Sequence, residues 1–206
     1  ARETTARVAA GATARKLLLP LADRGALTPL RSRDYLLYLL AESEVLLGEE
    51  TGDRRLWQSA LRHLRELEKL SQSPLQALAR VRLADCLYKL APDGKSDADI
   101  SPLYRAALAA GRSDMDVALL RFRLGELAER AGKKNDAREH WRKLYIDHPL
   151  HPLAGAAQDR LHKLDAEVKL EVSERIARAK NLLSGHRWFD AVAELRAIPS
   201  DAGPTL

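Results

Sequence analysis

Apolar residues recur along most of the chain at the three- and four-residue spacing of amphipathic helices. In one clear example after Asp53, the side chains that share a helical face are Trp57, Ala60, Leu61, Leu64 and Leu67. The stretch from Tyr35 to Ala41 is apolar on every side, which predicts a helix buried on all sides. The pattern therefore predicts a chain built from helices.

Start and stop signals divide this pattern into about ten helices. Polar caps and prolines mark the starts, and glycines or prolines mark the ends. The predicted helices are Thr5 to Leu19, Ser32 to Gly48, one opened by Asp53, Ser73-Pro74 to Ala91, Ser101-Pro102 to Gly111, Asp114 to Ala131, Asn135 to Asp147, Pro152 to Leu164, Ser173 to Ser184, and Trp188 to Ala197. The polar residues 95–100 are expected to form a long loop.

Composition supports the same fold class. The 206 residues include 38 Leu and 33 Ala, both strong helix formers, but only 17 Val, Ile and Thr together. No break in composition divides the chain, so residues 1–206 are expected to form a single all-α domain. Short turns between consecutive helices predict antiparallel pairs, stacked as a bundle or a solenoid.

One stretch, residues 118–151, has the pattern of a packed helical pair. Gly125 and Ala137 are small where two helices would cross closely, and Trp141 fills the space beside them. The residues expected to pack this pair are Leu124, Gly125, Ala137, Trp141 and Pro149. The unit resembles a tetratricopeptide repeat, a helix–turn–helix unit of about 34 residues.

A second, looser pair spans residues 173–199, with Ala191 as its small residue at the crossing. Upstream of residue 118 the elements are spaced too irregularly to assign repeats. The resemblance to tetratricopeptide repeats implies a right-handed superhelix of antiparallel helix pairs, an α-solenoid.

The segment that links these two helix pairs is more distinctive in sequence than either pair. A link with two prolines, Pro149 and Pro152, is followed by an Ala-rich helix carrying Arg160-Leu161. A helix with a small, Leu-rich face and a short helix of Ala–Glu–Leu character come next. This succession, residues 120–199, resembles the N-terminal α-superhelical region of soluble periplasmic lytic transglycosylases, which cleave the glycan strands of peptidoglycan.

The resemblance implies a non-catalytic scaffold that supports or positions glycan strands for a separate lysozyme-like domain. In the family that domain carries a Glu-Ser pair followed by Gly-Leu-Met-Gln. Here the only such pair is Glu42-Ser43, and no Gly-Leu-Met-Gln follows it, so we interpret the pair as chance. The chain is therefore expected to be a fragment of a longer periplasmic enzyme whose signal peptide has been removed. A cytoplasmic location stays open.

Several residues could carry chemistry of their own, and each has a plainer structural interpretation. Cys86 lies between leucines on one helical face, which predicts a buried, inert thiol. His148 and His151 flank a proline, which favours a solvent-facing turn over a metal site. Surface charge is the expected role of a further set, Glu126, Glu129, Glu139, Arg121 and Arg123. No catalytic, cofactor-binding or metal-binding residue is predicted.

The net charge of +5 could suggest an anionic partner, but the cations alternate with anions, as on solvated helix faces. With only 5% aromatic residues, nucleic-acid binding is disfavoured. The expected partner is peptidoglycan, or a protein or peptide. The alternative function is a stand-alone adaptor of tetratricopeptide type that binds a protein or peptide in envelope assembly. No apolar run approaches the roughly 20 residues of a membrane span.

Overall fold

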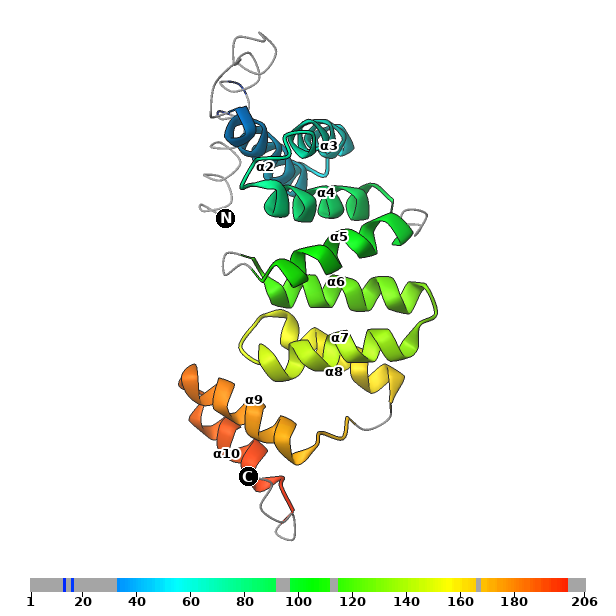
Figure 1. The fold of residues 1–206 in the computed structure, drawn as a ribbon. Helices are drawn as coiled ribbons and strands as arrows, with labels where there is room; N and C mark the ends of the chain where they lie inside the picture. Colours follow the sequence, from blue (N-terminus) through cyan, green and yellow to red (C-terminus); the bar gives the residue numbers. More distant parts are fainter. Residues whose placement is uncertain are drawn as a thin grey trace. The chain divides into compact units, whose positions relative to one another are not determined.

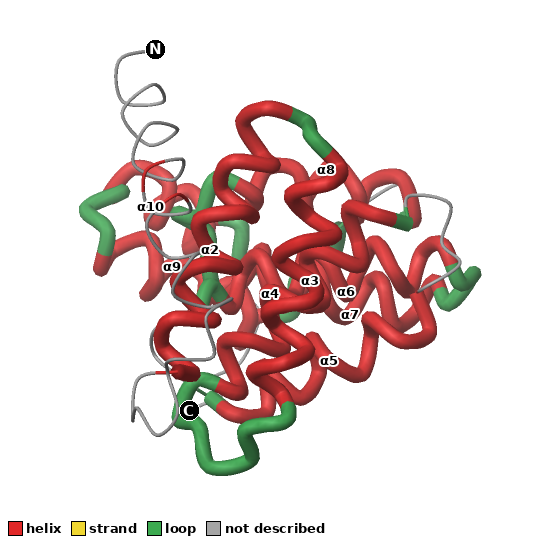
Figure 2. Tube along the Cα trace, turned by 90° about the horizontal axis from the view of Figure 1, so that it is seen from above, coloured by secondary structure: helices red, strands yellow, loops and turns green. Residues whose placement is uncertain are grey.

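The computed structural model describes residues 13, 16, 33–91, 97–111, 115–165 and 168–199. In these residues the chain forms helices joined by turns and loops, and none of them lies in a β-strand (Figures 1 and 2). The described part contains nine helices, labelled α2 to α10 in Figure 1. The predicted all-α class is thus confirmed. The helix predicted from Thr5 to Leu19 falls outside the described residues, apart from residues 13 and 16.

The described residues divide into two compact units, the first ending at Met115 and the second beginning at Asp116. The first unit contains α2 (Arg33–Thr51), α3 (Arg54–Glu68), α4 (Gln76–Leu90) and α5 (Asp97–Ala110). The second contains α6 (Val117–Arg130), α7 (Lys134–Asp147), α8 (Leu153–Leu164), α9 (Val172–Ser184) and α10 (Trp188–Arg196). Each unit has a hydrophobic core of its own. The prediction that residues 1–206 form one domain stays a prediction.

Most predicted helix ends agree with the structure to within a residue or two, and Gly111 ends α5 in the left-handed conformation, at φ 59°. The start of α5 was predicted wrongly. The helix begins at Asp97, inside the expected loop, and Pro102 lies within it. Asp97 and Asp99 occupy the first turn, where carboxylates stabilise the positive end of the helix dipole, and Ile100 is fully buried. These contacts outweigh the backbone hydrogen bond that Pro102 removes.

Three other helices begin at a residue different from the predicted one. The helix expected at Ser73-Pro74 begins two residues later, at Gln76, after a turn in which the Ser73 hydroxyl accepts a hydrogen bond from the Leu75 N–H. The cap of α6 is Asp116, whose carboxylate accepts from the Leu119 N–H at 2.9 Å. Asp114, the cap predicted for α6, lies outside the described residues, and so does Ser32, the cap predicted for α2.

The predicted cap Asn135 is instead the second residue of α7, because Gly132 reverses the chain at φ 71° and leaves room for a very short turn. The expectation that Tyr35 to Ala41 is buried on all sides is also wrong. Leu37, Leu40 and Ala41 are buried on one face of α2, while Tyr35 is 54% exposed. A phenol hydroxyl can remain in water at little cost, so this helix needs only one buried face.

In the second unit, α6 and α7 form an antiparallel pair that crosses at a glycine (Figure 1). The fully buried Trp141 of α7 lies against Gly125 of α6, where an added methyl group would overlap the indole ring. The indole N–H donates a hydrogen bond to the Phe122 carbonyl of α6 at 3.3 Å. The guanidinium carbon of Arg160, on α8, lies 5.7 Å from the centre of the Trp141 ring. One indole ring therefore fixes the contacts of three successive helices.

The first unit uses the same arrangement, which the sequence analysis missed. Trp57 of α3 lies against Gly48 of α2, where a methyl carbon would come within 2.8 Å of the indole nitrogen. Lys89 of α4 supplies the cation, with its Nζ 5.8 Å from the centre of the Trp57 ring. Both crossing glycines lie in the tripeptide Leu-Gly-Glu, at residues 47–49 and 124–126. This repeated tripeptide is the sequence feature that indicates the first crossing.

Substitution of Gly125 tests the importance of this crossing. Gly125→Ala is expected to lower the free energy of unfolding by about 2 kcal/mol, because the added methyl forces the indole away from α6. The matched control is Gly155→Ala in α8, where an added methyl meets nothing within 4 Å, and it should raise stability by about 0.5–1 kcal/mol. Urea denaturation of both variants measures the difference, and equal effects would contradict the packing role of Gly125.

Candidate functional site

The structure brings most of the predicted packing residues together. Leu124, Gly125, Ala137 and Trp141 are all buried in the α6–α7 pair. Pro149 lies two residues after α7 ends, in the turn that leads to α8. Ala191 lies elsewhere, fully buried between α10 and α9 with Ala179 and Leu182.

The three glutamates expected to carry surface charge, Glu126, Glu129 and Glu139, are each bound by a cation. Glu129 accepts a hydrogen bond from Arg160 Nη1 at 2.6 Å, and Glu126 accepts one from Arg123 at 3.0 Å. Glu139 forms a pair with Lys143 one turn along α7, and its side chain is 62% exposed. These carboxylates hold helices together or face solvent, so their contacts favour the structural interpretation over acid–base chemistry.

The Glu42-Ser43 pair is also used structurally. Glu42 forms a two-pronged ion pair with Arg82 of α4, at 2.5 and 2.6 Å. The Ser43 hydroxyl donates to the Leu39 carbonyl one turn earlier in α2. The pair therefore belongs to the packing of α2 against α4.

Cys86 is fully buried in the core of the first unit, as predicted. Burial raises the pKa of its thiol to about 12, so at neutral pH the sulfur is not a nucleophilic thiolate.

His148 and His151 lie in the turn after α7. His151 Nε2 lies 3.2 Å from a carboxylate oxygen of Asp116, and its Nδ1 accepts from the Leu153 N–H. Burial lowers the pKa of His148. Within the described part of the chain, no group of three or more His, Cys, Asp or Glu side chains could hold a metal ion.

A buried polar trio in the first unit escaped the sequence analysis. Glu44 of α2 is fully buried, and its Oε1 accepts a hydrogen bond from the Ser59 hydroxyl of α3 at 2.8 Å. His63 Nε2 lies 3.6 Å from the other carboxylate oxygen. In a nucleophilic triad the serine donates to the histidine, but here it donates to the carboxylate and is itself buried. The trio therefore fits a role in joining α2 to α3 rather than nucleophilic catalysis.

His63 of this trio also lines a basic hollow of about 440 Å³ on α3. The residues that line it are Arg62, His63, Arg65, Glu66 and Lys69. Arg62 donates to the Ser59 hydroxyl at 3.3 Å, and Lys69 binds Glu66 at 2.5 Å. Arg65 is exposed and forms no ion pair with any described residue. With three cations and one carboxylate, the hollow favours an anionic ligand.

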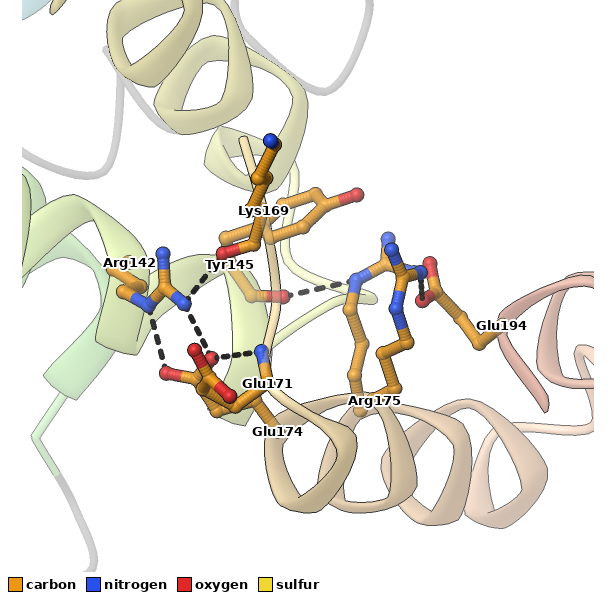
Figure 3. A network of polar contacts seen from close by, with 8 residues as sticks. Arg142, Tyr145, Lys169, Glu171, Glu174, Arg175 and Glu194 are labelled. Carbon is orange, nitrogen blue, oxygen red and sulfur yellow. Dashed lines mark hydrogen bonds and ion pairs between the residues drawn. The ribbon is translucent and has the colours of Figure 1, made fainter. Parts of the chain in front are cut away.

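In the second unit, arginines join α7, α9 and α10 (Figure 3). Arg142 of α7 binds both carboxylate oxygens of Glu174 at the start of α9 and also donates to the Lys169 carbonyl at 2.7 Å. Its hydrogen bond to Glu174 lowers the pKa of that carboxyl below 4.5. Glu174 Oε2 also accepts from the Glu171 N–H, which caps the helix.

The second half of this network surrounds Arg178 of α9. Its guanidinium lies 4.1 Å from the centre of the Tyr145 ring of α7, and its Nε donates to the Tyr145 carbonyl at 3.3 Å. The same guanidinium binds Glu194 of α10, which also accepts from Arg175 at 3.2 Å. These contacts tie three helices together and leave little of the network free for a ligand.

Comparison of the chain with protein-family models, with curated proteins and with solved structures finds no match. The resemblance to lytic transglycosylases thus stays a prediction. Of the helices that the structure describes, none has the length and apolar character needed to cross a membrane.

The pH dependence of stability tests the Arg142–Glu174 link. Glu174→Gln removes a carboxylate whose pKa is lower in the folded than in the unfolded chain. Its contribution is therefore fully present above pH 4.5 and is lost as the pH falls through the lower, folded-state pKa. We expect the substitution to cost about 1 kcal/mol at pH 7, and progressively less at acid pH.

The control is Glu139→Gln, which breaks an exposed pair within one helix and should cost at most about 0.5 kcal/mol. Urea denaturation at pH 7 and pH 3 measures both variants. A Glu174→Gln deficit that stays constant between these pH values would contradict the link.

Proposed function

We propose that this chain is a non-catalytic helical scaffold of the kind found in the N-terminal region of periplasmic lytic murein transglycosylases. In this proposal its helix pairs stack as a tetratricopeptide-like superhelix and position glycan strands of peptidoglycan for a separate lysozyme-like domain. The family resemblance in residues 120–199 motivates the identity of the polymer.

The pairing of glutamates with arginines on other helices supports a role as a scaffold. Glu42, Glu129, Glu174 and Glu194 each bind an arginine on another helix. A general acid or base needs a carboxyl that can exchange a proton with a substrate, and a strong arginine pair opposes protonation. These four carboxylates instead hold helices in place.

The basic hollow on α3 is the single structural observation that carries the choice of the contact site, whereas the resemblance motivates the polymer. Peptidoglycan has peptide stems that carry carboxylates, and such groups are attracted to a surface with Arg62, Arg65 and Lys69. Arg65 has no ion-pair partner among the described residues, so it can bind a carboxylate without breaking an existing pair. We assign the hollow as the contact for peptide stems.

Sedimentation with isolated peptidoglycan sacculi tests the proposal. The purified chain should pellet with sacculi and release no soluble glycan fragments. The double substitution Arg62→Glu and Arg65→Glu should reduce retention at least tenfold, because it replaces two attractive charges by two repulsive ones. Lys163→Glu with Lys180→Glu is the matched control, since both lysines are exposed, lie in the other unit and give the same change in net charge.

Equal loss in both double variants would show a nonspecific charge effect and contradict the assigned site. Release of glycan fragments would contradict a non-catalytic role. No retention on sacculi, together with a stoichiometric protein partner, would replace the proposal by the stand-alone adaptor.

A further inference from the structure

A single serine connects the basic hollow on α3 to a fully buried carboxylate of α2. The hydroxyl of the buried Ser59 donates a hydrogen bond to Glu44 Oε1 at 2.8 Å. Arg62, which lines the hollow, donates from Nη2 to the same hydroxyl oxygen at 3.3 Å. A polar path therefore leads from Glu44, through Ser59, to an exposed cation of the hollow.

The hydrogen bonds along this path have one direction. A carboxylate only accepts hydrogen bonds, a guanidinium only donates them, and a hydroxyl has a single hydrogen to give. Since Ser59 gives its hydrogen to Glu44, it turns a lone pair toward Arg62. The other oxygen of Glu44 lies 3.6 Å from His63 Nε2, so both ends of the carboxylate contact α3. The buried Glu44 thereby sets the serine as an acceptor for the arginine.

The two arginines of the hollow differ in how they are held. Ser59 binds one of the five N–H groups of Arg62, and because a hydroxyl is neutral, the positive charge stays available to a ligand. Arg65 is exposed and forms no ion pair with any described residue. An arginine that moves freely in water loses rotamer freedom when it binds, whereas one that is already held loses less.

We propose that Arg62 is the anchor for the ligand carboxylate in this hollow, and that Ser59 and Glu44 are its positioning residues. This role rests on the proposed function, since the carboxylates of peptide stems are the ligand. A positioned guanidinium presents two parallel N–H groups to the two oxygens of a carboxylate. Arg65 adds the attraction of its charge without a fixed geometry.

Exchange of each arginine for lysine tests this difference. Arg62→Lys and Arg65→Lys both keep the charge of the hollow and lie on the same helix, so each is the control for the other. We expect Arg62→Lys to raise the apparent dissociation constant for isolated sacculi about fivefold, and Arg65→Lys at most about twofold, because an ammonium lacks the planar pair of donors. Equal weakening in the two variants, measured by sedimentation, would overturn the anchor role of Arg62.

A double-mutant cycle tests the positioning role of Ser59. Ser59→Ala removes both hydrogen bonds of the hydroxyl, so it should raise the same constant about threefold in the native chain. In a chain that already carries Arg62→Ala, the substitution should leave the constant unchanged. A general loss of structure would weaken binding in both backgrounds. Equal weakening in both would therefore overturn the positioning role.

Nuclear magnetic resonance of the free chain tests the contact without sacculi. The hydrogen bond to Ser59 should slow rotation of the Arg62 guanidinium about its Nε–Cζ bond relative to that of Arg65, and Ser59→Ala should abolish the difference. Equal rotation rates in the native chain, together with binding to sacculi, would overturn this inference and leave the proposed function intact. No binding to sacculi, with Arg62 still slow, would instead overturn the proposed function and the anchor role that rests on it.

Discussion

Each unit of this protein depends on an indole ring that occupies the space left by a glycine on the neighbouring helix. Trp141 lies against Gly125, and Trp57 lies against Gly48. The ring sets how closely the two helices approach, and a cation from the third helix lies over it. Because the tryptophan side chain contacts both the preceding and the following helix, a single residue sets the spacing of three successive helices.

Arginine–carboxylate pairs reinforce these contacts in the first unit and extend the packing to α9 and α10 in the second. Arg82 links α4 to α2, Arg142 links α7 to α9, and Arg178 links α9 to α7 and α10. Their partners are the acidic groups from which an active site would be built. This use of the carboxylates supports the scaffold that we propose. Among the described residues, the cations Arg62, Arg65 and Lys69 of α3 stay exposed.

Much of the fold could be predicted because helix periodicity, caps and glycine stops act over a few residues. The Gly125–Trp141 contact was found from small and large residues at repeat spacing. Gly48 and Trp57 were missed because they lie closer to their turn, at Gly52, so the spacing between the pair is shorter than in the second unit. Contacts such as Arg142 with Glu174 join residues 32 positions apart and leave no local pattern. The basic hollow on α3 also depends on how side chains are arranged in space.

The central claim is that each unit is organised around its own glycine–tryptophan crossing. Hydrogen exchange of backbone amides in Gly48→Ala, read helix by helix, tests it most directly. The account predicts faster exchange in α2, α3 and α4, where the methyl displaces Trp57, and unchanged exchange in α6, α7 and α8. Exchange that is unchanged throughout, or faster to the same degree in both units, would contradict it.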